Sequence, residues 1–198
     1  MKKVKLILAI TLMTSLSLTA MSCKNGTKEN TATNTEHSEM NHDEMNASTD
    51  KTVSDAQNST DAQKVLTAYM ALKDALVATN ESAAAKAGKT LENTLKAFKV
   101  NNYSAEQQKE LKDIIADATE HAEHISRSEI GHQREHFKVL SKDIIDMVAI
   151  TGTENTLYQQ FCPMYDGGGA WLSMEKNVKN PYYGNKMLTC GKVQKEIN

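Results

Sequence analysis

The sequence predicts an all-α fold: an antiparallel, up-and-down bundle of about four helices, with a small irregular C-terminal cap that contains a short strand. Three observations predict this fold. Apolar residues recur at helical spacing in four successive segments between residues 60 and 152. Three of these segments begin with a Ser or Thr followed three residues later by Gln or Glu, the capping-box pattern. Short connections between long amphipathic helices make consecutive helices antiparallel neighbours.

The first two helices are expected to form one hairpin. Thr60-Asp-Ala-Gln63 reads as the capping box that opens the first helix. The second is expected from about Glu81 to Val100, and Asn101 follows it. The apolar residues expected to face the core are, in the first helix, Val65, Tyr69, Leu72 and Leu76, and in the second, Leu91, Leu95 and Phe98.

The third and fourth helices are expected to form the second hairpin. Ser104-Ala-Glu-Gln107 opens the third, and Ser126-Arg-Ser-Glu129 is expected to open the fourth, which Gly152 closes. The residues expected in the core are Leu111, Ile114, Ile115, Ala118, Ala122 and Ile125, and then Ile130, Phe137, Leu140, Ile144, Met147 and Val148.

The start of the chain predicts export to a bacterial cell envelope. Residues 1–22 have a lysine-rich start and a short apolar run, as an export signal does. Small Ser22 before Cys23 resembles a lipoprotein cleavage site, which implies acylation of Cys23 and attachment to a membrane, periplasm-facing or outer. The alternative is ordinary signal-peptidase cleavage. Loss of the signal's three lysines takes the formal net charge from −2 to −5, which argues against a nucleic-acid partner.

Residues 23–59 are expected to form a disordered tether, because they are polar and almost free of bulky apolar residues. The tether contains a small repeat in which imidazole and thioether side chains recur at fixed spacing, a composition that captures copper weakly. Chance recurrence in a polar linker is the alternative. The residues of this expected secondary metal site are His37, Met40, His42 and Met45.

The stretch from Phe161 to Gly191 carries sulfur at both ends. Residues 60–198 are expected to form one helical bundle with this stretch as its C-terminal Cys/Met metal-binding cap. Cys162 and Met164 lie at one end of the stretch, and Met187 and Cys190 at the other. Pro163 favours extended backbone at Cys162, which would turn Met164 to the same side. Thiolate and thioether ligands select Cu(I) over hard cations. A disulfide between Cys162 and Cys190 is an equally open interpretation in an oxidising compartment.

The segment before and within this stretch has further structural signals. Leu157 to Phe161 reads as a short strand. Asp166 and the three glycines after it indicate a flexible loop. Trp171 and Leu172 are expected to anchor the cap on the bundle.

The histidines of the helices are weaker signals. His132 and His136 fall together beside the core stripe of the fourth helix, His121 lies near the edge of the third helix's stripe, and His124 faces further out. Surface or boundary histidine is the commoner state. His132 to His136 also matches the H-x-x-E-H of inverted zinc peptidases, but no convincing downstream helix offers a third ligand, so we do not expect an enzyme.

Five sequence motifs together resemble a domain family of Gram-negative envelope proteins. They are H-Q-R-x-x-F-x-x-L-S, Y-x-Q-F-C-P-M, W-L-S, N-P-Y-x-G and M-L-T-C-G. That family, catalogued as a domain of unknown function, occurs alone in lipoproteins and fused to periplasmic adaptor subunits of copper and silver efflux pumps. The likeness covers about Thr60 to Val193. Tyr165-Asp166-Gly-Gly-Gly departs from the small apolar residue expected after C-P-M.

The resemblance implies copper handling and favours metal over a disulfide. Carried over by position, the implied ligands are His132, Cys162, Met164, Met187 and Cys190. Two hypotheses follow. The first is an envelope lipoprotein that binds Cu(I), with Ag(I) or Zn as other possible ions, for copper homeostasis, resistance or delivery. The second is an interaction module, closed by a Cys162–Cys190 disulfide, that docks on an efflux adaptor or another envelope partner.

Overall fold

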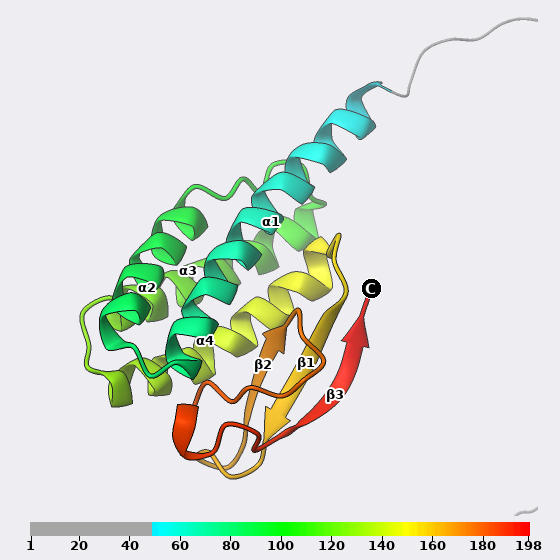
Figure 1. Cartoon of the computed structure of the whole chain (residues 1–198). Helices are drawn as coiled ribbons and strands as arrows, with labels where there is room; N and C mark the ends of the chain where they lie inside the picture. Colours follow the sequence, from blue (N-terminus) through cyan, green and yellow to red (C-terminus); the bar gives the residue numbers. More distant parts are fainter. Residues whose placement is uncertain (1–48) are drawn as a thin grey trace, which may run out of the picture. The chain divides into compact units, whose positions relative to one another are not determined.

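The computed structural model describes residues 49–198, with side chains from residue 60 onward. Four helices lead into a small cap, as the sequence predicts (Figure 1). The helices are α1 (Thr49–Val77), α2 (Glu81–Lys96), α3 (Ala105–Ile125) and α4 (Ile130–Thr151). The cap comprises β1 (Leu157–Cys162), β2 (Gly169–Ser173), the 3-10 helix η1 (Gly184–Lys186) and β3 (Lys192–Ile197).

Two of the three predicted capping boxes are not used as expected. Helix α1 already begins at Thr49, so Thr60 lies inside the helix instead of at its N-terminal cap. The Ser104 box is confirmed: the Ser104 Oγ accepts from the backbone N–H of Gln107 (3.3 Å), and the Gln107 side chain accepts from Ser104 N (3.0 Å). The capping-box pattern therefore marks a helix start at Ser104, which follows a turn, but not at Thr60, which lies inside a helix.

The start of α4 is also a correction. Ser126 is the C-terminal cap of α3, and the N-cap of α4 is Glu129. The Glu129 carboxylate accepts from the backbone N–H groups of Gly131 and His132, both at 2.8 Å. A carboxylate satisfies these free donors and also complements the positive end of the helix, so the acidic residue of the motif took the cap position. Gly152 closes α4 as predicted.

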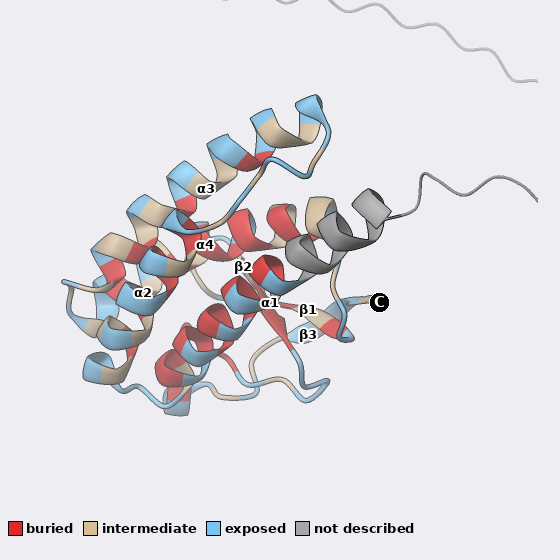
Figure 2. Ribbon diagram, turned by 90° about the horizontal axis from the view of Figure 1, so that it is seen from above, coloured by how far each residue is buried: buried red, intermediate tan, exposed pale blue. Residues whose placement is uncertain are grey.

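One hydrophobic core joins all four helices to the cap, and the buried residues in Figure 2 lie on the facing sides of the helices. The predicted stripe of α1 is fully buried, and so are Leu91 and Leu95 of α2. Tyr69 stacks on Phe137 with ring centroids 5.4 Å apart, and its hydroxyl lies 2.8 Å from Ser141 Oγ. Contact between α1 and α4 therefore fixes the middle of the bundle.

The cap is more regular than predicted, because its three strands form one antiparallel sheet in the order β2-β1-β3. Strand β1 agrees with the predicted strand and gains Cys162 as its last residue, paired with Gly169. Trp171 and Leu172 of β2 are fully buried, as expected of anchors. The backbone N–H of Leu172 donates to the Tyr69 hydroxyl at 3.1 Å. This bond attaches the sheet directly to α1.

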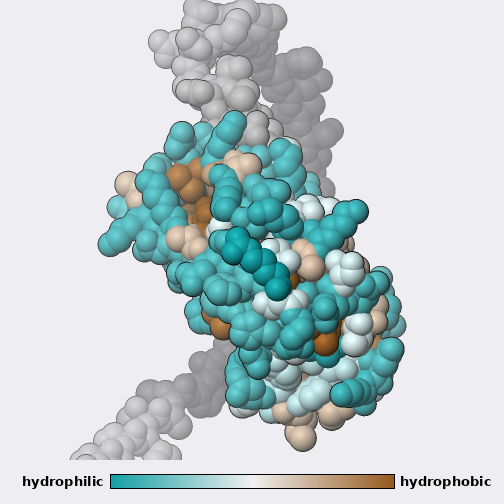
Figure 3. Space-filling model, turned by 90° about the vertical axis from the view of Figure 1, so that its left-hand side faces the viewer, coloured by the Kyte–Doolittle hydropathy of each residue, from teal (hydrophilic) through white to brown (hydrophobic). Residues whose placement is uncertain are grey.

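The surface is mostly polar on the face shown in Figure 3, where the brown hydrophobic areas are small and separate. Within residues 49–198, no helix has both the length and the apolar character that crossing a bilayer requires.

Candidate functional site

Two cysteines from distant parts of the chain meet in the cap. Cys162 ends β1 and is buried, while Cys190 lies in the loop between η1 and β3 and is half-buried. Their Sγ atoms are 2.8 Å apart, and neither thiol forms a disulfide. The structure thus brings together the two cysteines that the sequence paired.

Asn180 and Gly191 hold the loop of Cys190 against the sheet. The side chain of fully buried Asn180 donates to the carbonyl of Cys190 (2.7 Å) and accepts from the backbone N–H groups of Tyr182 and Tyr183. Gly191 has φ +140°, and a Cβ there would lie 2.9 Å from the Phe161 carbonyl oxygen. Glycine alone fits this close approach without strain. The residues N-P-Y and C-G therefore build one structural unit around Cys190.

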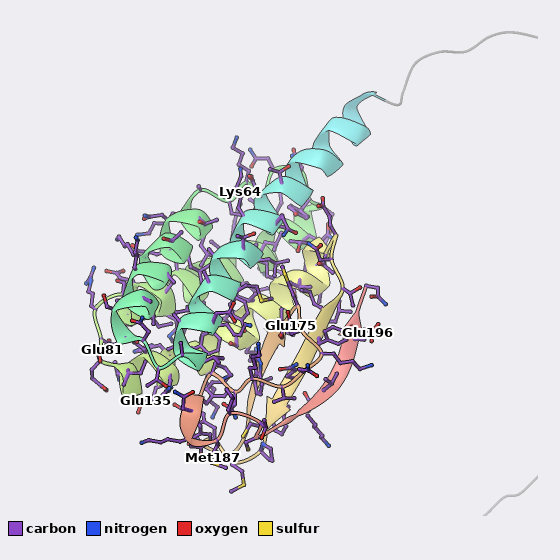
Figure 4. All side chains as sticks on the ribbon, in the orientation of Figure 1. Lys64, Glu81, Glu135, Glu175, Met187 and Glu196 are labelled. Atoms are coloured by element: carbon purple, nitrogen blue, oxygen red, sulfur yellow. The ribbon has the colours of Figure 1, made fainter. Side chains whose placement is uncertain are left out.

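The two methionines lie near the ends of these arms but are exposed. Strand β1 stops at Cys162, so Met164 lies in the following turn, and the expected strand alternation does not extend to it. Its side chain is 63% exposed, and that of Met187 is 38% exposed. Met187 is tied to Cys190 by a turn in which Cys190 N–H donates to the Met187 carbonyl (3.0 Å). Met187 is labelled in Figure 4 at the η1 end of the cap.

The two thiols can either bind a metal ion or be oxidised to a disulfide. The hydrogen bond with Cys162, followed by burial, raises the pKa of Cys190, which favours its protonated thiol unless a cation replaces the proton. Two sulfurs bound to one tetrahedral metal ion at about 2.3 Å would lie about 3.8 Å apart. At 2.8 Å the sulfurs are closer than that, so metal binding requires them to separate, and oxidation requires them to approach.

His132 does not join the cysteines in the contacts that the structure gives it. Its Nδ1 lies 2.8 Å from Glu135 Oε2, and its Nε2 lies 3.0 Å from His136 Nε2. These contacts place His132 in a histidine cluster between α3 and α4. The ligand set implied by the family resemblance is therefore divided between two places.

The histidine cluster contains four side chains, two from α3 and two from α4. His136 is central: its Nδ1 lies 2.8 Å from His121 Nδ1, and its ring stacks on that of His124 with centroids 4.5 Å apart. Burial, and then the neighbouring histidines His124, His121 and His132, lowers the pKa of His136 to about 4. A ring that stays neutral at pH 7 keeps a lone pair free for a metal or a hydrogen bond.

The helical period of the sequence placed His132 and His136 together on one face of the fourth helix, but it did not bring them together with His121 and His124 of the third helix. One signal was available. Helices α3 and α4 are joined by a very short connection, so the C-terminal turn of α3, which carries His121 and His124, must lie beside the N-terminal turn of α4.

The opposite side of α4 holds the cap. The Arg134 guanidinium donates to the carbonyl of Pro181 in the cap (Nε, 3.0 Å) and to the carbonyl of Leu76 in α1 (Nη2, 3.1 Å). Lys138 pairs with Asp166 in the glycine loop (2.7 Å). Helix α4 thus carries histidines on one side and cap contacts on the other. Cys23 and the tether residues His37, Met40, His42 and Met45 lie outside the described residues.

Comparison with known proteins identifies one relationship. Residues 65–156 match a family model described as "Protein of unknown function (DUF3347)". The match covers most of the bundle, including His132, and ends just before β1. No curated protein and no solved structure matches the chain. The comparison thus supports a domain-of-unknown-function family for the bundle and is silent on Cys162 and Cys190.

Proposed function

We propose that this chain is a copper-binding protein that holds Cu(I) between Cys162 and Cys190. The observation that carries the proposal is the meeting of two free thiols, from positions 28 residues apart, at 2.8 Å in the cap. Thiolates are soft ligands and suit Cu(I), and Ag(I) shares that preference. Zinc also binds thiolates and is a weaker expectation.

The cap can allow the two cysteine sulfurs to separate, and it offers methionine ligands to complete the coordination of a metal ion. Cys162 is fixed in the sheet, whereas Cys190 belongs to a loop and is less buried, so separation of the sulfurs falls to the Cys190 loop. Met187, one turn away, is exposed enough to rotate toward an ion. Met164 is the second thioether candidate. A neutral thioether adds a ligand without adding charge.

Mutation of the sulfur ligands tests this function. Cys162→Ser or Cys190→Ser should abolish tight Cu(I) binding, measured by competition with a chromogenic Cu(I) chelator under reducing conditions. Met187→Leu and Met164→Leu should weaken binding less, because each removes one neutral ligand. Met174→Leu is the matched control, since Met174 lies in the same cap and is similarly exposed (42%). A Cys162→Ser, Cys190→Ser double variant that binds Cu(I) as tightly as the parent would refute the site.

An interaction module closed by a disulfide is the second candidate. The 2.8 Å separation and the complete burial of Cys162 favour it, because a covalent bond needs only a short approach of the two sulfurs. In this case both thiols of protein purified from its natural compartment would resist alkylation until reduced, and added copper would leave them unchanged.

The envelope location is part of the same proposal. Export and acylation of Cys23 would attach the folded domain to a membrane through the residues between Cys23 and α1, within reach of an efflux adaptor or another envelope metalloprotein. The signal-like residues 1–22 motivate it. Cys23→Ala should move the protein from the membrane fraction to the soluble fraction, and unchanged partition would exclude the anchor.

A further inference from the structure

The turn between α3 and α4 gathers side chains whose chemistry the thiol site does not use. His124 from α3 and His132 and His136 from α4 each offer one ligand atom, and these three atoms lie within 4.8 Å of one another. The rings also touch: His132 meets His136 edge to face with centroids 4.5 Å apart. Three histidines from two helices thus converge on one point.

The spacing of the nitrogens fits a shared metal ion. His132 Nε2 and His136 Nε2 are 3.0 Å apart. Two nitrogens bound at 2.0–2.1 Å lie about 3.3 Å apart in a tetrahedral shell and about 2.9 Å apart at a right angle. An ion could therefore enter between these two rings with shifts of a few tenths of an ångström. The pair is also spaced i, i+4 on α4, which presents both rings on one helix face.

A carboxylate sets the tautomer of His132 so that a lone pair faces the cluster. Glu135 accepts from Nδ1 of His132, because a carboxylate has no proton to give. In the neutral ring this leaves Nε2, the atom beside His136, as the free ligand atom. A carboxylate behind a histidine in this way is the usual outer-shell support of a metal ligand. On α3, Glu120 approaches His124, with Oε1 to Nε2 at 4.0 Å.

The cluster is open to solvent on one side. The side chains of His124 and His132 are 51% and 49% exposed, and His136 and His121 are half-buried behind them. An ion can reach the rings without unfolding either helix. Glu135, labelled in Figure 4, lies at the same end of the molecule as Met187, but on α4 and not on the cap.

We propose that His124, His132 and His136 form a binding site for a divalent transition metal ion, separate from the thiol pair. Imidazole ligands without sulfur suit Zn²⁺, Cu²⁺ and Ni²⁺, and the general order of affinity places Cu²⁺ first. The site thus takes the divalent ions, while the cap thiols take Cu(I). A protein with both sites would bind copper in either oxidation state. This inference stands independently of the proposed Cu(I) function.

Titration of the full mature chain with Zn²⁺ alone, by calorimetry, tests the site. All variants carry His37→Asn and His42→Asn, so that the tether histidines do not contribute. His132→Asn and His136→Asn should each weaken Zn²⁺ binding by more than the roughly 10–100-fold that loss of an outer-shell partner causes. Glu135→Gln should weaken it within that range. Cys190→Ser should leave it unchanged.

The controls separate this site from its alternatives. His121→Asn removes a histidine of the cluster that lies outside the group of three, and it should weaken binding less than tenfold. An effect as large as that of His136→Asn would overturn the assignment of the three ligands. If Cys190→Ser removes Zn²⁺ binding and His132→Asn does not, the ion binds at the thiols and the histidine site is wrong. Circular dichroism should be used to check that each variant is folded. His132→Asn is the variant least expected to disturb folding, because the His132 side chain is half-exposed.

Discussion

At the residue scale, Asp143 is a carboxylic acid that is buried where its charged form is unfavourable. It is 8% exposed, and its Oδ2 has no hydrogen-bond partner among the described residues. Burial, and then the negative charge of Asp117 on α3, raises its pKa to about 6; Lys142 opposes this shift and Asp146 adds to it. Because the pKa in the folded state lies above the unfolded value of about 3.9, ionisation of Asp143 destabilises the fold.

Asp143→Asn should therefore stabilise the protein at neutral pH. The contribution of Asp143 to stability is fully present below pH 4 and is lost as the pH rises through about 6. Removing the charge should raise the free energy of unfolding at pH 7.5 by about 1–3 kcal/mol, and by much less at pH 4.5. Urea unfolding at the two pH values measures this. Asp146→Asn, at an exposed ion pair with Lys142, is the control and should change stability by less than about 1 kcal/mol.

His132 shows what sequence could predict at this scale and what it could not. The helical period correctly groups His132 with His136 beside the core stripe. The helical period does not show which other element packs on that face, because this depends on how the helices and the cap are arranged in space. The resemblance directed His132 to the cap, whereas its contacts are with α3 and with its own helix.

At the element scale, apolar periodicity predicted the helices well, because burial of a stripe dominates their stability. End signals were less certain: a capping motif inside a longer helix, such as Thr60-Asp-Ala-Gln63, is indistinguishable from one at its start. Strands β2 and β3 were not predicted, because neither has a clear alternation of apolar and polar residues over a long run. β2 is five residues long, and β3, with a mostly exposed, charged sequence, is an edge strand that pairs with β1 alone.

The loop of Cys190 depends on one side chain, so Asn180→Ala should loosen the cap without melting the bundle. The substitution removes a donor to the Cys190 carbonyl and an acceptor for two backbone N–H groups, all in a buried place. We expect a loss of about 2 kcal/mol or more. Trp171, the only tryptophan and fully buried in β2, reports on the cap by its fluorescence, and far-ultraviolet circular dichroism reports on the helices.

The expected result for Asn180→Ala is a red-shifted tryptophan emission at a denaturant concentration where helix content is still unchanged, together with faster alkylation of Cys190. Asn155→Ala is the matched control, since the Asn155 side chain is exposed and makes one bond, to Gln63 (3.2 Å). Coincident loss of fluorescence and helix signals in Asn180→Ala would mean that cap and bundle unfold as one unit and would contradict the prediction.

At the scale of the whole molecule, α4 connects the two candidate sites. His132 and His136 lie on one side of it, and Arg134 and Lys138 hold the cap from the other side. The family match spans this helix and ends before the cap. The bundle thus carries the histidine cluster, and the cap after it carries the thiol pair.

Deletion of the His/Met repeat distinguishes metal binding by the folded domain from metal binding by the tether. Deletion of residues 36–46 removes the His/Met repeat and leaves every residue of the thiol pair and of the histidine cluster in place. The deleted chain should keep one tight Cu(I) equivalent and lose only weak, additional copper binding, because the repeat offers imidazole and thioether ligands but no thiolate. Chelator competition with the parent and the deleted chain side by side measures both classes. Loss of all Cu(I) binding would assign the function to the tether and would leave the cap cysteines as a structural pair.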